Sequence, residues 1–243
     1  MKKNVIFKLF VAFVAMTLAF TACKDDDALP IHTALVTVKP MQNTFVMQLD
    51  DTTQLIPDNP SVCHFRDKQV RALVAYQNRH KEANGQRFVT ICRIDSIRTK
   101  SYEPSLGTKE ADIKAYGNDP IDIMRSWVTV AEDGYLTLCL RTVWGQPGVV
   151  HYMHLVSGVD ESNPYLLELR HNANGDIIGY PHNCLIAFDL RELLKQVPSK
   201  EAKFTIRWNS SVGTRTHDFV FNTQINDEVG STDDLLDYND YVQ

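Results

Sequence analysis

The chain of 243 residues is long enough for two domains of about 100 residues each. Its composition, 44% hydrophobic and 23% charged, is ordinary for a folded protein and excludes general disorder. Residues 1–22 hold three lysines and no acidic residue, so the net charge of −5 becomes −8 without them. No cluster of Lys and Arg is available to neutralise phosphates, which argues against nucleic acid as a partner.

The first 22 residues have the order of a secretory signal, in which basic residues precede an apolar run and small residues. The apolar run at 9–20 would span about 18 Å as a helix, too short for a bilayer core of roughly 30 Å. Residues 18–23, LAFTAC, resemble the lipobox of bacterial lipoproteins. The resemblance implies lipidation of Cys23 and anchoring in the outer membrane, whereas in a plain signal peptide Cys23 would be incidental.

A polar tether, residues 23–33, follows this signal and carries the run Lys24, Asp25, Asp26 and Asp27. In surface lipoproteins of one group of gram-negative anaerobes, a similar acidic run after the lipidated cysteine directs export to the outer leaflet. The alternative is a solvated spacer. The mature protein is therefore expected to face either the cell surface or the periplasm.

From residue 33 onward, apolar residues alternate with a period of two, and turn residues recur every 8 to 12 positions. The pattern predicts an all-β protein with strands at 34–39, 44–49, 69–76, 87–97, 126–130, 135–143, 149–156, 165–171, 184–189, 203–209 and 216–222. Turns are predicted at 132–134, 145–148, 174–176 and 211–213. The only predicted helix is 189–196, with Asp189 as its cap.

Breakers concentrate in residues 98–119, where no strand is predicted, and the domain boundary is placed there. The predicted division is 34–112 for the first domain, 113–225 for the second, and an acidic tail at 226–243 that is either flexible or docked on a sheet.

Four further cysteines, two in each predicted domain, leave disulfides open in an exported protein. Cys92 and Cys139 lie within predicted strands beside apolar residues, which favours small buried side chains over reactive thiols. The other two of these four cysteines are Cys63 and Cys184.

No motif supports a metal, a cofactor or catalysis. His151 and His154 would point to opposite faces of a strand. The run 172–176, NANGD, lacks the first Asp and last Glu of a calcium loop and indicates a turn. HExxH, Walker, GxSxG and GxGxxG sequences do not occur. The sequence therefore predicts a protein that is not an enzyme.

Aromatic residues of the second domain are the remaining indication of a ligand, because exposed flat rings can stack on sugars or anchor a protein. Trp144 lies in a turn with Gly145 and Pro147, so it is expected to be partly exposed and is the candidate ligand contact.

Five segments resemble the NigD-like lipoproteins in sequence and in order: 49–57 (LDDTTQLIP), 70–76 (VRALVAY), 94–100 (IDSIRTK), 118–121 (NDPI) and 167–176 (LELRHNANGD). The resemblance, which runs to about residue 225, implies an OB-like barrel followed by a β-sandwich and no catalytic residue. The expected function is a binding or adaptor module of the cell envelope, with a protein or glycan as partner. The alternatives are a bacteriocin-associated immunity or envelope-protection protein and a glycan-binding accessory lipoprotein.

Overall fold

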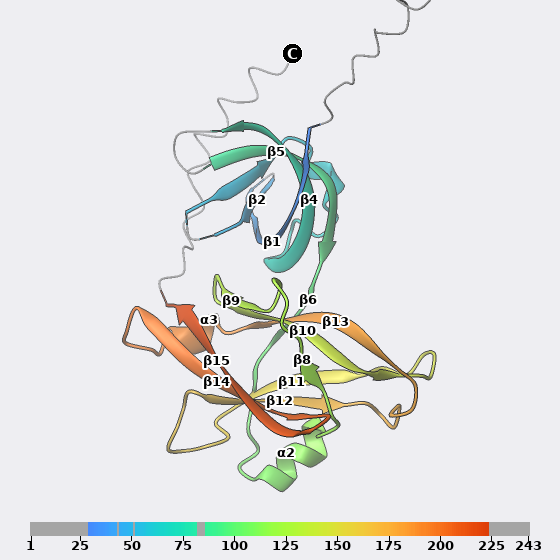
Figure 1. The fold of residues 1–243 in the computed structure, drawn as a ribbon. Helices are drawn as coiled ribbons and strands as arrows, with labels where there is room; N and C mark the ends of the chain where they lie inside the picture. Colours follow the sequence, from blue (N-terminus) through green and yellow to red (C-terminus); the bar gives the residue numbers. More distant parts are fainter. Residues whose placement is uncertain (1–28, 43, 51, 82–85, 224–243) are drawn as a thin grey trace, which may run out of the picture. The chain divides into compact units, whose positions relative to one another are not determined.

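The computed structural model describes residues 29–42, 44–50, 52–81 and 86–223 (Figure 1). The predicted signal peptide, Cys23, the run from Lys24 to Asp27 and the acidic tail lie outside these residues. Within them, no helix is long and apolar enough to cross a membrane.

The N-terminal strands form a closed barrel in the order β1-β2-β3-β5-β4. Its strands are β1 (Ile31–Pro40), β2 (Phe45–Gln48), β3 (Gln54–Pro57), β4 (Val70–Lys81) and β5 (Gln86–Ser96). Every pairing is antiparallel except that of β3 with β5. Alternate residues such as Val36, Val38 and Val74 fill the interior, as the period of two predicts. The short strand β3 was not predicted, because four residues give too little alternation to recognise.

The remaining strands form two sheets that face each other as a sandwich (Figure 1). One sheet has the order β6-β13-β10-β8, with β9 also paired to β10, and the other has the order β15-β14-β12-β11-β7. Between the sheets lies a core that includes Leu138, Leu167, Phe204 and Phe221. The strands are β6 (Arg98–Ser101), β7 (Glu103–Pro104), β8 (Asp122–Ile123), β9 (Val130–Glu132), β10 (Tyr135–Trp144), β11 (Tyr152–Ser157), β12 (Leu166–Asn172), β13 (Tyr180–Asp189), β14 (Glu201–Ser210) and β15 (Gly213–Asn222).

The segment 98–119, where no strand was expected, contains two short strands and a helix. β6 pairs in parallel with β13 and β7 with β11, so residues 98–104 belong to the sandwich sheets although the predicted division places them in the first domain. Such short strands are held by distant partners and leave no local period. Helix α2 (Lys109–Tyr116) was also missed; the Thr108 hydroxyl caps it by accepting from the Ala111 N–H at 3.2 Å.

The predicted C-terminal helix is present as α3 (Arg191–Leu194), shorter than expected. The Asp189 carboxylate accepts a hydrogen bond from the Arg191 N–H at 3.1 Å, although Leu190 occupies the cap position itself.

The predicted turn at 132–134 connects β9 to β10 and contacts the barrel. Asp133 and Gly134 have φ of 51° and 78°, the left-handed pair of a tight hairpin. The fully buried Arg71 of β4 donates to Glu132 Oε2 at 2.6 Å, and Lys39 of β1 lies 3.1 Å from Asp133 Oδ1. These two ion pairs join barrel strands to the sandwich.

The four cysteines of the described chain are free thiols. Cys63 and Cys139 are buried, and burial raises the pKa of both thiols. The prediction for Cys139 is confirmed, but that for Cys92 is wrong, because Cys92 is exposed. Its apolar neighbour Ile91 points inward, and the alternation of a strand turns the next side chain outward.

Candidate functional site

The site lies at one end of the sandwich, where β10 ends and β13 begins. Trp144 pairs with Tyr180 there. The two backbones come so close beside this pair that the adjacent position of each segment, 145 and 179, must be glycine. A Cβ atom added to Gly145 would lie 1.9 Å from the Ile178 carbonyl oxygen, and one added to Gly179 would lie 2.2 Å from that of Trp144. This close approach fixes the positions of the aromatic residues beside it.

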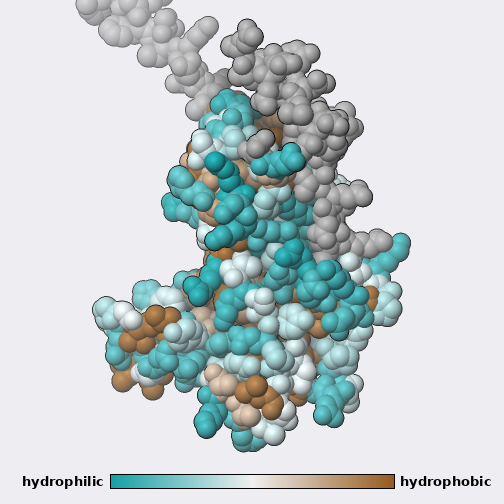
Figure 2. Space-filling view, turned by 180° about the vertical axis from the view of Figure 1, so that it is seen from behind, coloured by the Kyte–Doolittle hydropathy of each residue, from teal (hydrophilic) through white to brown (hydrophobic). Residues whose placement is uncertain are grey.

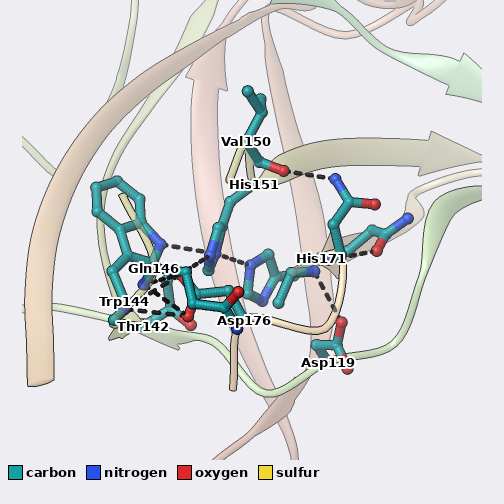
Figure 3. A network of polar contacts seen from close by, with 12 residues as sticks. Asp119, Thr142, Trp144, Gln146, Val150, His151, His171 and Asp176 are labelled. Atoms are coloured by element: carbon teal, nitrogen blue, oxygen red, sulfur yellow. Dashed lines mark hydrogen bonds and ion pairs between the residues drawn. The ribbon is translucent and has the colours of Figure 1, made fainter. Parts of the chain in front are cut away.

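Asp176 is the centre of a buried polar network at this end (Figure 3). It closes the turn formed by Asn174 and Gly175, whose φ values are 50° and 81°. The predicted turn at 174–176 is confirmed, but it is not a hairpin, because it leads from β12 in one sheet to β13 in the other. Its carboxylate accepts hydrogen bonds from the N–H groups of Gly145 and Gln146 at 3.1 to 3.2 Å. Burial opposes ionisation, but these two N–H groups and His151 outweigh it and lower the pKa of Asp176.

His151 has its tautomer fixed by its neighbours. The Trp144 Nε1, which can only donate, lies 2.6 Å from His151 Nδ1, so that nitrogen must accept. The proton of the neutral ring is then on Nε2, which lies 3.2 Å from Asp176 Oδ2. His151 thus connects a tryptophan ring at the surface to a buried carboxylate.

His171 stacks against His151 with ring centroids 5.1 Å apart. Its Nε2 lies 2.9 Å from His151 Nδ1, and its Nδ1 lies 3.2 Å from the Pro120 carbonyl oxygen. The lone pair of His151 Nδ1 is already taken by the Trp144 N–H, so the one N–H of a neutral His171 lies on Nδ1 and donates to the Pro120 carbonyl. Burial is the largest cause of a lowered pKa of His171; His151 adds to it, while the Pro120 carbonyl and Asp119 oppose it.

Two hollows flank this network. A cavity of about 450 Å³ has a wall of mixed polar and apolar side chains, comprising Asp119, Pro120, Asp122, Arg141, Thr142, Val143, His171, Ala173, Asp176, Ile177, Pro181 and Ser211. A second, more open hollow of about 560 Å³ is lined by Trp144, Gly145, Gln146, Pro147, Gly148, Val149, Asp176, Tyr180, His182 and Asn183. Asp176 lines both hollows. Figure 2 shows hydrophobic side chains exposed among polar ones on the sandwich, and Ile177 and Ile178 are among the exposed apolar residues.

Trp144 is partly exposed, as the sequence predicts, and it lines the second hollow. Trp208 is buried in the core, and Trp127 is exposed but lines neither hollow. Cys23 and residues 24–27 cannot be placed relative to this site, since they lie outside the described residues.

The two histidines considered in the sequence have separate surroundings. His151 is buried in the network, whereas His154 Nδ1 lies 2.7 Å from Glu103 Oε1. In the described part of the chain, no group of three His, Cys, Asp or Glu side chains could hold a metal ion. The network itself was missed; its only local signal is the turn NANGD next to a buried strand.

Comparison with known families gives matches over both domains. Residues 35–97 match the NigD-like N-terminal OB domain, and residues 104–221 match the NigD-like C-terminal beta sandwich domain. The chain belongs to the NigD-like family. The predicted architecture, an OB-like barrel followed by a β-sandwich, is thereby confirmed.

Several solved structures are similar to this NigD-like chain. A protein of Parabacteroides distasonis described as toxin-related is 26% identical, with a TM-score of 0.68 over 86% of this chain and 99% of that one. A Bacteroides fragilis protein named as a lipoprotein is 14% identical, with a TM-score of 0.58 over 80% and 99% of the two chains. A NigD-like immunity protein of Bacteroides caccae is 17% identical, with a TM-score of 0.51 over 77% and 90%. A search of curated proteins finds no match.

Proposed function

We propose that this NigD-like protein is a lipid-anchored, non-enzymatic binding module of the cell envelope, and that the end of its sandwich is the binding surface. The observation that carries the proposal is the cavity of about 450 Å³ beside the buried network. Pockets that bind small ligands typically have this volume, a mostly apolar wall and a few fixed polar groups. Asp176 and His171 are such groups, because their own hydrogen bonds hold them in place.

The arrangement of the titratable groups favours binding over catalysis. A general base needs a lone pair directed at a substrate, and both nitrogens of His151 face protein partners. The Asp176 carboxylate is likewise occupied by N–H donors on both of its oxygens. These side chains are therefore better suited to shaping a rigid wall than to exchanging protons with a ligand.

The anchor would be Cys23, whose lipidation is supported by the lipobox-like sequence and by the similar Bacteroides fragilis protein that carries the name of a lipoprotein. Residues 24–27 would then decide between the cell surface and the periplasmic face of the outer membrane. Either location brings the sandwich within reach of envelope proteins and glycans.

Affinity capture tests the binding role of the cavity. The full chain with Cys23→Ser serves as soluble bait for an envelope extract, and each captured component is then titrated against the purified protein. Ile177→Trp enlarges a side chain that lines the cavity, whereas Ile178→Trp adds the same ring to the adjacent residue, which does not line it. We expect only Ile177→Trp to weaken binding. A partner that both variants bind equally well would place the binding surface elsewhere.

A bacteriocin-associated immunity or protection role is the first alternative. It is favoured by the similar proteins described as toxin-related and as a NigD-like immunity protein. Deletion of the gene should then lower the tolerance of the cells to a bacteriocin, and the Ile177→Trp variant should fail to restore it. Unchanged tolerance against toxins of neighbouring strains would remove this alternative. The second alternative, glycan binding, is supported by the aromatic residues that line the second hollow.

A further inference from the structure

We propose that the hollow lined by Trp144, Tyr180 and His182 binds a neutral saccharide. This inference rests on the proposed binding function and names a ligand class for the same end of the sandwich. It uses the hollow of about 560 Å³ and not the cavity that Ile177 lines.

The aromatic wall of the hollow is rigid before any ligand arrives. The Trp144 and His182 rings lie nearly parallel, 25° apart in plane and 6.4 Å apart between centroids. From behind, His151 holds the Trp144 ring through the 2.6 Å hydrogen bond to Nε1 and through an edge contact at 5.1 Å. A ring fixed in this way loses little conformational entropy when a ligand stacks on it. Tyr180, 77% exposed, adds a third ring whose hydroxyl is at the surface.

The polar groups of the hollow suit hydroxyl groups. Asn183 Oδ1 accepts from Arg141 Nε at 2.8 Å, so the oxygen of this amide is occupied and its N–H groups remain for a ligand. In the described structure, the side chains of Gln146, Tyr180 and His182 make no hydrogen bond among themselves or to other residues. Amide, phenol and imidazole groups can each donate to or accept from a hydroxyl. A sugar ring presents hydroxyls along its edge and C–H groups on its faces, and the faces match the aromatic wall.

The charge of the hollow excludes other ligand classes. None of the residues that line it is Lys or Arg, and Arg141, which donates to Asn183, lines the other cavity, so a phosphate or carboxylate in the hollow would lose its hydration without a cation in its wall. Its one carboxylate, Asp176, already accepts from Gly145, Gln146 and His151 and is not available to a cation. A purely apolar ligand would leave the amide groups of Gln146 and Asn183 without partners. A neutral, hydroxyl-rich ligand with a flat apolar face remains.

The test is a glycan array probed with the full chain carrying Cys23→Ser, followed by titration of the best neutral oligosaccharide while tryptophan fluorescence is recorded. We expect neutral glycans to bind, acidic ones not to bind, and the fluorescence to change on binding. Tyr180→Ala should weaken the affinity about tenfold or more, a free energy of ~1.4 kcal/mol, without affecting folding, since its ring is exposed. Trp127→Ala, which removes an exposed ring outside the hollow, is the matched control and should bind as the wild type does.

Three results would overturn the inference: no glycan bound on the array, binding confined to acidic glycans, or equal affinities of the Tyr180→Ala variant and the wild type. Each result would leave the proposed function standing if a captured partner still distinguished Ile177→Trp from Ile178→Trp. If the Ile177→Trp and Ile178→Trp variants bound the captured partner equally well while Tyr180→Ala still weakened glycan binding, only the proposed role of the cavity would be refuted.

Discussion

Asp176→Ala should be among the most destabilising single changes at the site, because the carboxylate serves three donors. Gly145 and Gln146 are exposed, so water can replace the acceptor that their N–H groups lose. The His151 side chain is only 2% exposed, and its Nε2–H would be left without an acceptor. The buried donor of His151 costs about 1–3 kcal/mol and the two backbone hydrogen bonds about 1 kcal/mol each, so the free energy of unfolding should fall by ~3–5 kcal/mol.

Tryptophan fluorescence during urea unfolding measures this change specifically, because all three tryptophans, at 127, 144 and 208, belong to the sandwich. Asp160→Ala is the matched control: it removes an exposed carboxylate that accepts from the N–H and hydroxyl of Ser162, and it should cost at most ~0.5 kcal/mol. Asp176→Asn, which keeps one acceptor oxygen, should be intermediate. Equal midpoints for the Asp176→Ala and Asp160→Ala variants would refute the reasoning.

Three further predictions concern pH, packing and the anchor. Since burial lowers the pKa of His171, the unfolded chain takes up a proton near pH 6.5 that the folded protein resists. Stability should therefore be retained above pH 6.5 and fall as the pH drops below it, and His171→Gln should flatten that fall in urea titrations. Gly145→Ala should cost ~3 kcal/mol or more because of the clash with the Ile178 carbonyl, against ~1 kcal/mol for Gly148→Ala, where φ is positive but the space is open. Cys23→Ser should move the protein from the membrane to the soluble fraction without unfolding it, and replacing Asp25, Asp26 and Asp27 by Ala should abolish protease accessibility on intact cells while the protein stays membrane-bound. Continued accessibility would make the acidic run only a spacer.

Several features follow from the sequence alone because their causes are local. Alternation of apolar residues identifies most strands, since adjacent side chains of a strand point to opposite faces. The turn at 132–134 follows from a dipeptide, Asp133-Gly134, that tolerates the left-handed conformation. The partial exposure of Trp144 follows from its position at a turn with Gly145 and Pro147. The lipobox-like residues and the acidic run are likewise local patterns, and their roles stay predictions.

The site depended on the tertiary structure. Asp176 meets the Gly145 N–H across 31 residues, His171 meets His151 across 20, and Asp119 accepts from Ala173 across 54. Strand alternation indicates which face a side chain takes, but not which strand covers that face, so His151 could not be distinguished from an ordinary strand histidine. The same limit explains Cys92, exposed beside a buried Ile91, and β6 and β7, which are held by partners more than 50 residues away. Hydrogen bonds over such separations form only after the sheets have paired, and that is why the network at the end of the sandwich has no counterpart in the local sequence pattern.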